Sequence, residues 1–388
     1  KFVDIWNRPF IKPDIITGWN CIPINSSLWK EDEIININEV QVGDKLYDSN
    51  VIRKFPESSK PVVVQKLSNG QRIKSSKEHI FPYRLCPKDN YTKLSLGGKS
   101  YTSEEDISVE NAINDAREKF LFVNTRNNIN SDYLNYNLDQ CYLMGLIYTD
   151  GSLKSKNNLT HGFTFYQSDF EFMKKIKEKF SIKSKIVGPY KNCYHLHIPY
   201  SLLGDISPIY KDGKKHIDKK LISKFSEKQY MSFLSGMLDG DGYISKGKIS
   251  LCNFNNDIDN IYELSLWNGI FSCISENHIR FIDIDISKLS LLKEKRWGNF
   301  EESKLLRESS QKAKDIKFKK GNGGYWVRVK EIYEESDVTM IDIETDTHYF
   351  VTGGVKSHNC EFFDIPYLVN RIRNICGEDL ARNLSPWR

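Results

Sequence analysis

The stretch Val355-Lys356-Ser357-His358-Asn359-Cys360, near the C-terminal end of the chain, decides how the rest of the sequence is interpreted. Three consecutive positions hold a general acid–base group, a carboxamide and a thiol. The side-chain nitrogen of an asparagine can attack its own backbone carbonyl, which closes a succinimide and cuts the next peptide bond. A neighbouring imidazole can transfer the protons, and a fixed geometry raises the effective molarity. The thiol that follows can accept an acyl group. Alone, the same three residues also fit a surface turn.

The two ends of the sequence form one continuous motif when everything between them is removed. Asp14-Ile-Ile-Thr-Gly-Trp-Asn20, joined to Cys360-Glu-Phe-Phe-Asp364-Ile-Pro-Tyr, resembles the second exonuclease motif of phage-type family B DNA polymerases. The part between begins with Cys21 and ends with His358-Asn359, and it resembles an intein, a self-excising insert. The resemblance implies that residues 1–20 and 360–388 are the flanking polymerase segments, called exteins.

Composition and charge set the limits for the whole chain. Its 388 residues, mean hydropathy of −0.52 and 12% aromatic content are typical of a soluble globular protein of about two to three domains. We find no apolar run long enough to span a bilayer and no signal peptide. Because residue 1 is lysine, we expect the chain to begin inside a larger protein. The net charge of +5 permits nucleic-acid binding without requiring it.

The cysteines favour a reducing compartment. Eight of them are spread along the chain without a CxxC pair, a pattern that indicates free thiols rather than disulfides or a zinc site. We therefore expect a cytoplasmic protein of a prokaryotic or phage-infected cell.

Alternation of apolar and polar residues predicts strands after Cys21. Residues 35–40 alternate as a half-buried strand does, and Val42-Gly43-Asp44 predicts a turn into another strand. Asn69-Gly70 predicts a type I′ hairpin between strands at 61–65 and 71–74. Inteins begin with a strand, a Gly-Asp turn and a second strand, so the resemblance implies an all-β, horseshoe-like splicing domain of the Hint type.

The residues after this hairpin resemble the intein pattern Gly-x-x-Ile-x-x-Thr-x-x-His, with serine in place of threonine. Its four positions are occupied by Gly70, Ile73, Ser76 and His79. When the Cys21 thiol attacks the carbonyl of Asn20, the amide nitrogen of Cys21 must leave, and an amide is a poor leaving group unless it is protonated. The resemblance implies that His79 supplies this proton and that Ser76 helps to hold the peptide.

A thiol of ordinary pKa is mostly protonated at neutral pH, so Cys21 needs a neighbour that activates it. Our candidate is Asp342, because the stretch 339–351 resembles the intein block that carries an aspartate and, on the next strand, His-x-Phe. Asp342 would relay a proton or adjust the two reacting thiols, and His348 would support succinimide formation. A solvated strand carboxylate is the alternative for Asp342. Gly353-Gly354 predicts a tight turn before the final strand.

Two stretches in the middle of the chain are built alike. Residues 139–151 and 233–242 each predict an apolar helix that ends in Asp-Gly, and both resemble the LAGLIDADG motif of homing endonucleases. Each is followed by a hairpin rich in lysine and asparagine and then by a second helix, which opens at Ser168-Asp169 or at Asn256-Asp257, where Ser or Asn could cap it. This repetition predicts an α/β domain of two αββ-type pseudo-repeats.

The residue types of the motif suit a close helix pair. Gly145 and Gly236 would let the helices approach, and the glycines after the acids would act as left-handed C-caps. The resemblance implies that Asp150 and Asp241 meet at the base of the pair, bind Mg²⁺ and cleave DNA. The lysines of Gly213-Lys-Lys precede the second motif, where these enzymes often keep a catalytic lysine; a solvated loop is the alternative. Contacts to DNA would come from Lys154, Lys156, Lys185, Lys191, His195, Lys215, Lys246 and Lys248.

The sequence thus predicts a mixed fold: a splicing domain split into residues 21–128 and 322–359, with an endonuclease at 129–321 between the halves. Splicing would run through Cys21, Cys360 and Asn359 with help from His358, and would need no cofactor, whereas the nuclease would need Mg²⁺. The expected partners are double-stranded DNA of the uninterrupted polymerase gene and the chain's own flanks, with no membrane, and we expect a monomer. Three alternatives stay open: a splicing element whose nuclease no longer cuts, a sequence-specific DNA-binding module with the same fold, and a polymerase exonuclease fragment carrying a passive insert.

Overall fold

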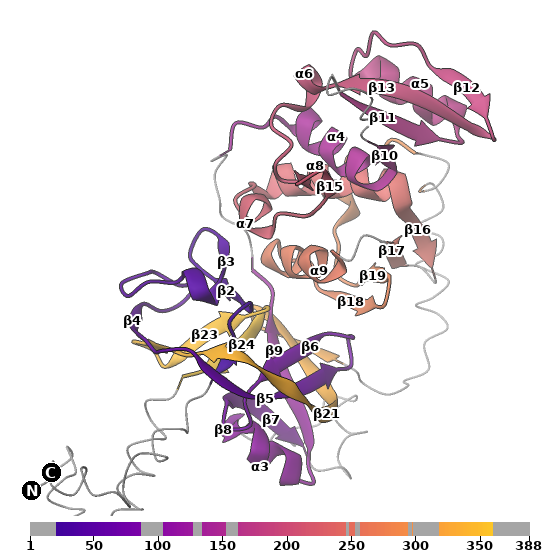
Figure 1. Cartoon of the computed structure of the whole chain (residues 1–388). Helices are drawn as coiled ribbons and strands as arrows, with labels where there is room; N and C mark the ends of the chain where they lie inside the picture. The colour runs from indigo at the N-terminus through magenta and orange to yellow at the C-terminus, as the bar shows by residue number, and fades with distance from the viewer. Residues whose placement is uncertain are drawn as a thin grey trace, which may run out of the picture.

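The computed structural model describes residues 21–86, 104–126, 134–152, 162–245, 248–252, 257–293, 297 and 318–359. Figure 1 shows two parts: a β-rich part built from both ends of the described chain, in indigo and yellow, and an α/β part built from its middle. The predicted mixture of an all-β part and an inserted α/β part is confirmed at this level. None of the helices among the described residues is both long and apolar enough to cross a membrane.

Within its described residues, the β-rich part contains one short α-helix, one 3₁₀ helix and strands from both chain ends. Its elements are β1 (Ile22–Pro23), β2 (Ser27–Trp29), β3 (Ile34–Asn36), η2 (Ile37–Glu39), β4 (Val51–Lys54), β5 (Ser58–Leu67), β6 (Arg72–Ser75), β7 (Ile80–Cys86), β8 (Glu104–Ser108), α3 (Val109–Asn114), β9 (Glu118–Asn124), β20 (Phe318–Gly321), β21 (Gly324–Ile341), β22 (Ile343–Thr345), β23 (Tyr349–Thr352) and β24 (Val355–His358).

Strands from the two ends of the chain alternate within one sheet. Its order is β3-β2-β23-β24-β7-β9-β21-β5-β6, with β1 and β20 paired to β21 and β8 paired to β7. The 18-residue strand β21 pairs with β5 along one stretch and with β9 along another. β20 begins at Phe318, so the β-rich part resumes slightly before residue 322, where the sequence suggested a boundary. Because the late strands lie between early ones, the complete sheet requires both ends of the described chain.

The inserted part begins with the predicted helix near residue 139. Its elements are α4 (Leu138–Asp150), β10 (Gly151–Ser152), β11 (Gly162–Gln167), α5 (Phe170–Lys179), β12 (Val187–Tyr190), β13 (Cys193–Pro199), α6 (Tyr200–Leu203), β14 (Tyr210–Lys211), β15 (Lys214–Lys215), α7 (Lys219–Ile222), α8 (Glu227–Asp241), β16 (Gly242–Ser245), β17 (Lys248–Cys252), α9 (Ile258–Trp267), β18 (Ser272–Ser275), β19 (His278–Phe281) and η4 (Ile286–Lys288).

The repeat seen in the sequence is present in the structure and is longer than predicted. α4 leads into a sheet of order β10-β11-β13-β12, and α8 leads into one of order β16-β17-β19-β18. In each repeat a second helix, α5 or α9, stands between the two pairs of strands. Each unit is therefore αββαββ, and the predicted αββ pattern is its first half.

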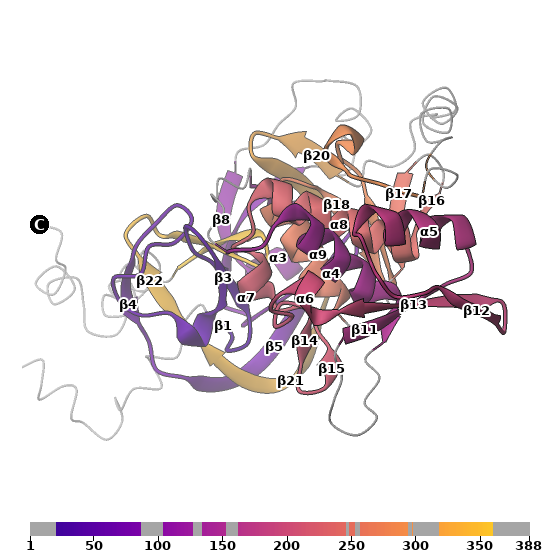
Figure 2. The same ribbon diagram turned by 90° about the horizontal axis from the view of Figure 1, so that it is seen from above.

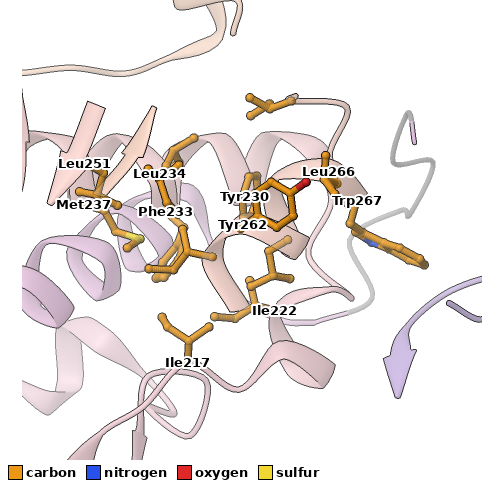
Figure 3. Packing of buried hydrophobic residues seen from close by; sticks show 14 of the residues in the cluster. Ile217, Ile222, Tyr230, Phe233, Leu234, Met237, Leu251, Tyr262, Leu266 and Trp267 are labelled. Atoms are coloured by element: carbon orange, nitrogen blue, oxygen red, sulfur yellow. The ribbon is translucent and has the colours of Figure 1, made fainter. Parts of the chain in front are cut away.

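The first helices of the two repeats pack directly against each other, as the motif glycines predicted. Figure 2 shows α4 and α8 together at the centre of the inserted part. A Cβ atom at Gly145 would lie 2.0 Å from the backbone oxygen of Phe233, and one at Gly236 would lie 2.0 Å from the backbone oxygen of Tyr142. Both helices start with a capping box, at Asn137 and at Ser226. Figure 3 shows the buried side chains that α8 and α9 contribute to this core.

The glycines at the ends of the two helices do not take the predicted left-handed conformation. Gly151 has φ −88° and Gly242 has φ −77°, and both are extended because the chain passes straight from each helix into a strand. A side chain is excluded for a different reason. A Cβ atom would lie 2.6 Å from the carbonyl oxygen of Ile147 in the first case and 2.4 Å from that of Leu238 in the second.

The predicted strand at 35–40 is only partly correct. β3 ends at Asn36, and a 3₁₀ turn follows from Ile37 to Glu39. Ile37 and Val40 are both buried. A 3₁₀ turn places residues three apart on the same face, whereas a continued strand would have turned one of these two side chains to solvent.

The predicted hairpin at Asn69-Gly70 exists, but its turn is not type I′. Only Gly70 has a positive φ, +94°, whereas a type I′ turn needs positive φ at both central residues. That conformation occurs instead at Gly353-Gly354, with φ +55° and +81°, where the sequence predicted a tight turn. The side chain of Asn69 makes a tertiary contact instead, described below, and this contact outweighs the local preference.

The predicted caps of the second helices also differ. Asp169, rather than Ser168, caps α5 by accepting a hydrogen bond from the Phe172 amide at 3.0 Å. Asp257 stands at the N-cap of α9 without a side-chain cap bond. Its carboxylate accepts from the Tyr148 hydroxyl at 2.8 Å instead, and Asn256 lies outside the described residues.

We predict that Gly145→Ala lowers the free energy of unfolding by about 2 kcal/mol. Alanine favours a helix over glycine by about 1 kcal/mol, but the contact with the Phe233 backbone forces the helices apart, and such overpacking costs more than that gain. Urea unfolding followed by tryptophan fluorescence measures the change.

Gly213→Ala is the control for this variant. Gly213 has φ +78° and no atom within 4 Å of its Cβ position, so alanine there costs only about 1 kcal/mol of backbone strain. A Gly145→Ala protein as stable as the wild type would contradict the close helix packing.

Candidate active sites

Three segments that are distant in sequence meet in the β-rich part. β1 pairs with the end of β21 so that Ile22 faces Ile341, and one further step in this register sets Cys21 opposite Asp342. β24 pairs with β7 so that His358 faces Ile80, and the same step sets Asn359 opposite His79. The Ser76 amide donates to the carbonyl oxygen of Cys21 at 2.9 Å. The sheet register therefore brings both ends of the 21–359 segment to one place.

Cys21 is a buried thiol, with 2% of its surface exposed. Burial raises the pKa of Cys21 to about 11; the charge of Lys60 opposes this rise, and the charge of Asp342 adds to it. At pH 7 only about one thiol in ten thousand is ionised at such a pKa. Asp342 therefore cannot activate Cys21 by stabilising a thiolate. A carboxylate at this position can still act chemically as a base toward the thiol.

His79 and Ser76 occupy a packed turn between β6 and β7. Both are buried, with 0% and 1% of their surfaces exposed. The amide of His79 donates to the carbonyl oxygen of Ser76, and its ring packs on Phe81 with the centroids 4.5 Å apart. Phe350 approaches the edge of the same ring at 6.4 Å. These aromatic contacts fix the imidazole, and the Ser76 amide three residues earlier holds the Cys21 backbone.

The Asn359 side chain is held by a residue that the sequence did not point to, Thr345. Asn359 Nδ2 donates to the carbonyl oxygen and to Oγ1 of Thr345, both at 3.2 Å. Thr345 Oγ1 donates its own proton to the carbonyl oxygen of Tyr349 at 3.0 Å, so it offers Asn359 a lone pair. Threonine at this position looks like an ordinary strand residue, and only the fold shows that it orients the carboxamide.

His358 contacts the carbonyl group that would have to be attacked. Its Nδ1 lies 2.5 Å from the carbonyl oxygen of Asn359. Burial lowers the pKa of His358, and the contact with that carbonyl partly opposes the change. The imidazole is thus neutral at pH 7 and donates its Nδ1 proton to the carbonyl oxygen, which makes the carbonyl carbon more electrophilic.

His348 borders this site. Its ring is stacked parallel to His358 with the centroids 6.1 Å apart, and its carbonyl oxygen accepts from the Asn359 amide at 2.9 Å. Its φ of +64° is unusual for a residue other than glycine. Among the residues predicted for this chemistry, Asn20 and Cys360 lie outside the described residues. The other seven, Cys21, Ser76, His79, Asp342, His348, His358 and Asn359, lie in the described sheet and its turns.

A second group of charged side chains lies at the C-terminal ends of α4 and α8. Asp150 and Asp241 are the last residues of these helices, and both are half-buried. Lys215 Nζ donates to the carbonyl oxygen of Thr149 at 2.8 Å. Burial lowers the pKa of Lys215, while the charges of Asp150 and Asp241 act in the opposite direction. Lys215 is therefore placed beside both acids, whereas Lys214 on the same turn is exposed.

The donor set at these helix ends suits a hard cation. Asp150 Oδ2 lies 3.4 Å from the position that a Cβ atom would take at Gly240, so the carboxylate of one helix reaches the end of the other. Two carboxylates, completed by water and phosphate oxygens, are a typical Mg²⁺ environment. No group of three or more His, Cys, Asp or Glu side chains within the described ranges is placed to hold a metal.

The polar faces of the two four-stranded sheets are the predicted DNA surface. On the first sheet His195 lies beside Tyr166, with the ring centroids 6.0 Å apart, and Lys185 and Lys191 are exposed nearby. On the second sheet Lys248 donates to the carbonyl oxygen of Ile282 at 3.0 Å. Lys154, Lys156 and Lys246 lie outside the described residues.

Sequence reasoning missed polar groups on the second sheet. Tyr243 and His278 are joined through a contact of 3.2 Å between the hydroxyl and Nδ1, and exposed Arg280 is on the same face as His278. A search for lysines in hairpins misses these three residues, because none is a lysine and two of them, His278 and Arg280, lie on β19. Once the strand register is known, the alternation of side chains along the strands identifies them.

Comparisons with known proteins gave structural matches only. No family model matches the chain, and no curated protein matches it. Two crystal structures of the gp41-1 intein are similar to it: one of a triply substituted form at 18% identity, covering 27% of this chain and 68% of that one with a TM-score of 0.20, and one without the substitutions at 20% identity, covering 23% and 80% with a TM-score of 0.17.

The homing endonuclease I-DmoI in complex with DNA and Ca is similar at 16% identity, covering 38% of this chain and 85% of that one with a TM-score of 0.29. All of these TM-scores are below 0.5. We therefore base the functional assignment on the geometry of this chain.

We predict that Asp342→Asn lowers the pKa of Cys21 and also slows the reaction of its thiol. This is contrary to the usual expectation that a lower thiol pKa speeds attack. Loss of the charge lowers the thiol pKa, because Asp342 raises it, but thioester formation slows about a hundredfold, because the base is lost. The pH dependence of alkylation reports the pKa, and the fragment released by dithiothreitol reports the thioester.

Glu344→Gln is the matched control. This carboxylate is also buried, but it pairs with Arg53 at 3.5 Å, so both quantities should stay near their wild-type values. Faster thioester formation in the Asp342→Asn protein would show that the Asp342 charge only disfavours the Cys21 thiolate and does not act as a base.

Proposed function

We propose that this chain catalyses its own splicing, which releases residues 21–359 and joins the two flanks. First the Cys21 sulfur attacks the carbonyl carbon of Asn20. The carbon–nitrogen bond between these residues breaks, a thioester forms, and the Cys21 nitrogen takes up a proton. Supporting this step, the Cys21 carbonyl is bound by the Ser76 amide, and the register sets Cys21 opposite Asp342. His79 is the proton donor in this proposal, and Asp342 is the base.

The later steps use the other end of the segment. The Cys360 sulfur displaces the Cys21 sulfur from the thioester and so receives the N-terminal flank. Asn359 Nδ2 then attacks its own carbonyl carbon, and the bond to the Cys360 nitrogen breaks as that nitrogen is protonated. Finally the acyl group moves from the sulfur to the nitrogen of Cys360, which leaves an amide bond between the flanks. No cofactor enters this sequence of steps.

One observation carries the proposal: His358 Nδ1 lies 2.5 Å from the carbonyl oxygen of Asn359, and Thr345 holds Nδ2 of the same residue. Nucleophile and electrophile belong to one residue, and each is bound by a separate partner. A buried His-Asn pair with a purely structural role does not require separate partners on the Asn carbonyl oxygen and on its carboxamide. The likeness of the joined flanks to a polymerase exonuclease motif supports a family B DNA polymerase as the host protein.

A second activity is favoured by the charged group at the ends of α4 and α8. We propose that Asp150 and Asp241 hold Mg²⁺ and that the chain cuts double-stranded DNA at the uninterrupted polymerase gene. The ion would supply charge stabilisation at the phosphate and an activated water. Lys215, beside both carboxylates, limits their mutual repulsion and offers a proton donor near the cleaved phosphate. A protein that binds this DNA without cutting it is the alternative.

Intact mass after expression tests the splicing proposal. We expect residues 1–20 fused to 360–388, together with the free 21–359 segment. Asn359→Ala should stop release of the C-terminal flank, because the attacking nitrogen is lost. Thr345→Val should slow release about tenfold, because one of the two acceptors that orient Nδ2 is lost.

Thr347→Val is the control for Thr345→Val. The exposed Thr347 hydroxyl donates to the same Tyr349 carbonyl oxygen as Thr345 does, but Thr345 is the threonine that binds the Asn359 carboxamide. Fused flanks from the Asn359→Ala protein, or one unchanged wild-type chain, would overturn the proposal.

DNA cleavage is tested with a duplex that encodes the joined flanks. Wild-type protein should cut it with Mg²⁺ and stop in EDTA, whereas Asp150→Asn should bind the duplex without cutting it, because one of the two metal-binding carboxylates is gone. Asp139→Asn, an exposed residue of the first turn of α4, is the control and should cut normally. Wild-type binding without cleavage in Mg²⁺ would assign the inserted part to DNA binding alone.

A further inference from the structure

One face of α9, in the inserted part, is buried against the β-rich part. In Figure 1 this helix lies next to β6, β9 and β24, and Figure 3 shows Tyr262, Leu266 and Trp267 among the buried side chains. The Trp267 ring meets Trp29 edge to face, with the centroids 5.2 Å apart, and Arg126 covers its face at 4.1 Å. The contact is mainly aromatic at the Trp267 end of α9. At the other end, Tyr262 and Glu263 form hydrogen bonds to the β-rich part.

Tyr262 binds one turn of the β-rich part, the hairpin between β5 and β6. Its hydroxyl accepts from Asn69 Nδ2 at 2.7 Å and donates to Gln71 Oε1 at 2.9 Å. Gln71 Nε2 then donates to the carbonyl oxygen of Gly353 at 2.6 Å. The backbone supports the same turn, since the Ile274 amide donates to the carbonyl oxygen of Asn69 at 2.7 Å. The phenol thus holds the hairpin before Ser76, and Gln71 of that hairpin extends the network to the turn before β24.

Glu263 binds the strand next to that second turn. Its carboxylate is 5% exposed and accepts from Ser27 Oγ at 2.6 Å and from Trp29 Nε1 at 2.8 Å. Lys219 of α7 neutralises it at 2.6 Å. Ser27 Oγ in turn accepts from the Gly353 amide at 3.1 Å. The chain of contacts runs from a buried charge in the inserted part to the backbone of the turn between β23 and β24.

The shape of this turn depends on the helix as well. Gly354 has φ +81°, and a Cβ atom there would lie 2.6 Å from Leu266 Cδ1, so α9 packs directly on the turn backbone. The carbonyl oxygen of Gly354 accepts from the Asn124 amide at 2.7 Å. The turn is therefore held from α9 on one side and from β9 on the other.

Both turns stand at the far ends of the strands that lead to the reacting groups. β6 runs from the Asn69 hairpin to Ser76 and His79, and β24 runs from Gly354 to His358 and Asn359. We propose that α9 is a positioning element of splicing, in which Tyr262 and Glu263 set the register of β6 and β24. The two junctions, the bonds Asn20–Cys21 and Asn359–Cys360, therefore react at full rate only while the inserted part is folded against the sheet. This proposal rests on the splicing function proposed above.

Two variants of α9 test this. Tyr262→Phe keeps the ring and removes the hydroxyl, and Glu263→Leu removes the carboxylate. Each should slow both dithiothreitol-induced N-terminal cleavage and C-terminal release by about tenfold or more. Glu263→Gln should recover most of the rate, because its amide oxygen still accepts from Ser27 and Trp29. Hydrogen exchange, measured on the same proteins, should become faster at residues 69–79 and 353–359.

Two controls separate positioning from general damage to the insert. Tyr230→Phe removes an equally buried hydroxyl, whose contact with Ser265 at 3.1 Å lies within the inserted part. Asp259→Asn removes a charge from the first turn of α9 itself. Both should splice and exchange as the wild type does.

The outcomes distinguish this proposal from the splicing proposal. A wild-type chain that does not splice contradicts the proposed function, and the exchange measurement still decides whether α9 positions the strands. Wild-type splicing with unchanged rates in the Tyr262→Phe and Glu263→Leu proteins overturns the inference, and so does unchanged exchange at both segments. Equal slowing by Tyr230→Phe would also overturn it, because the loss would then reflect only a weakened insert.

Discussion

The placement of β24 between β23 and β7 is the constraint on which the rest depends. Through it the last described residue, Asn359, comes opposite His79, although 280 residues separate them in the numbering, and the pairing of β1 with β21 brings Cys21 opposite Asp342 by the same means. Strand pairing thus positions Cys21 and Asn359. The self-catalysis proposed above needs such placement, since the reacting groups belong to one chain and must meet without diffusing.

Burial sets the protonation states of the titratable groups at this site. It keeps Cys21 protonated and His358 neutral, so neither of these two groups carries a permanent charge that would need solvent. In the proposed reaction, hydrogen bonds from His358 to the Asn359 carbonyl oxygen and from the Asn359 carboxamide to Thr345 replace charge as the source of activation. At the ends of α4 and α8 the arrangement is the opposite. Two carboxylates and a lysine gather where a cation and DNA phosphates would be expected.

Local sequence patterns predicted the elements whose causes are local. The α4 and α8 helices, the close-approach glycines Gly145 and Gly236 and the Gly353-Gly354 turn all follow from periodicity and from residue chemistry. Tertiary contacts decided the failures. Asn69 adopts no type I′ turn because Tyr262 binds its side chain, and Asp257 gives no cap because Tyr148 and Ile217 use its carboxylate. Thr345 and the α9 interface depend on strand register between distant segments, which a single sequence does not encode in any short window.

The interleaving of early and late strands has a consequence for the timing of synthesis. β5 and β9 pair with β21, and β7 pairs with β24, so the N-terminal strands lack these partners until the ribosome has added roughly two hundred further residues. Pairing between such distant segments is slow to form. Cys21 can therefore emerge from the ribosome long before the pocket that would use it exists. For the splicing reaction proposed above, this topology alone would keep the nascent chain uncut until the segment that ends in Asn359 has been translated.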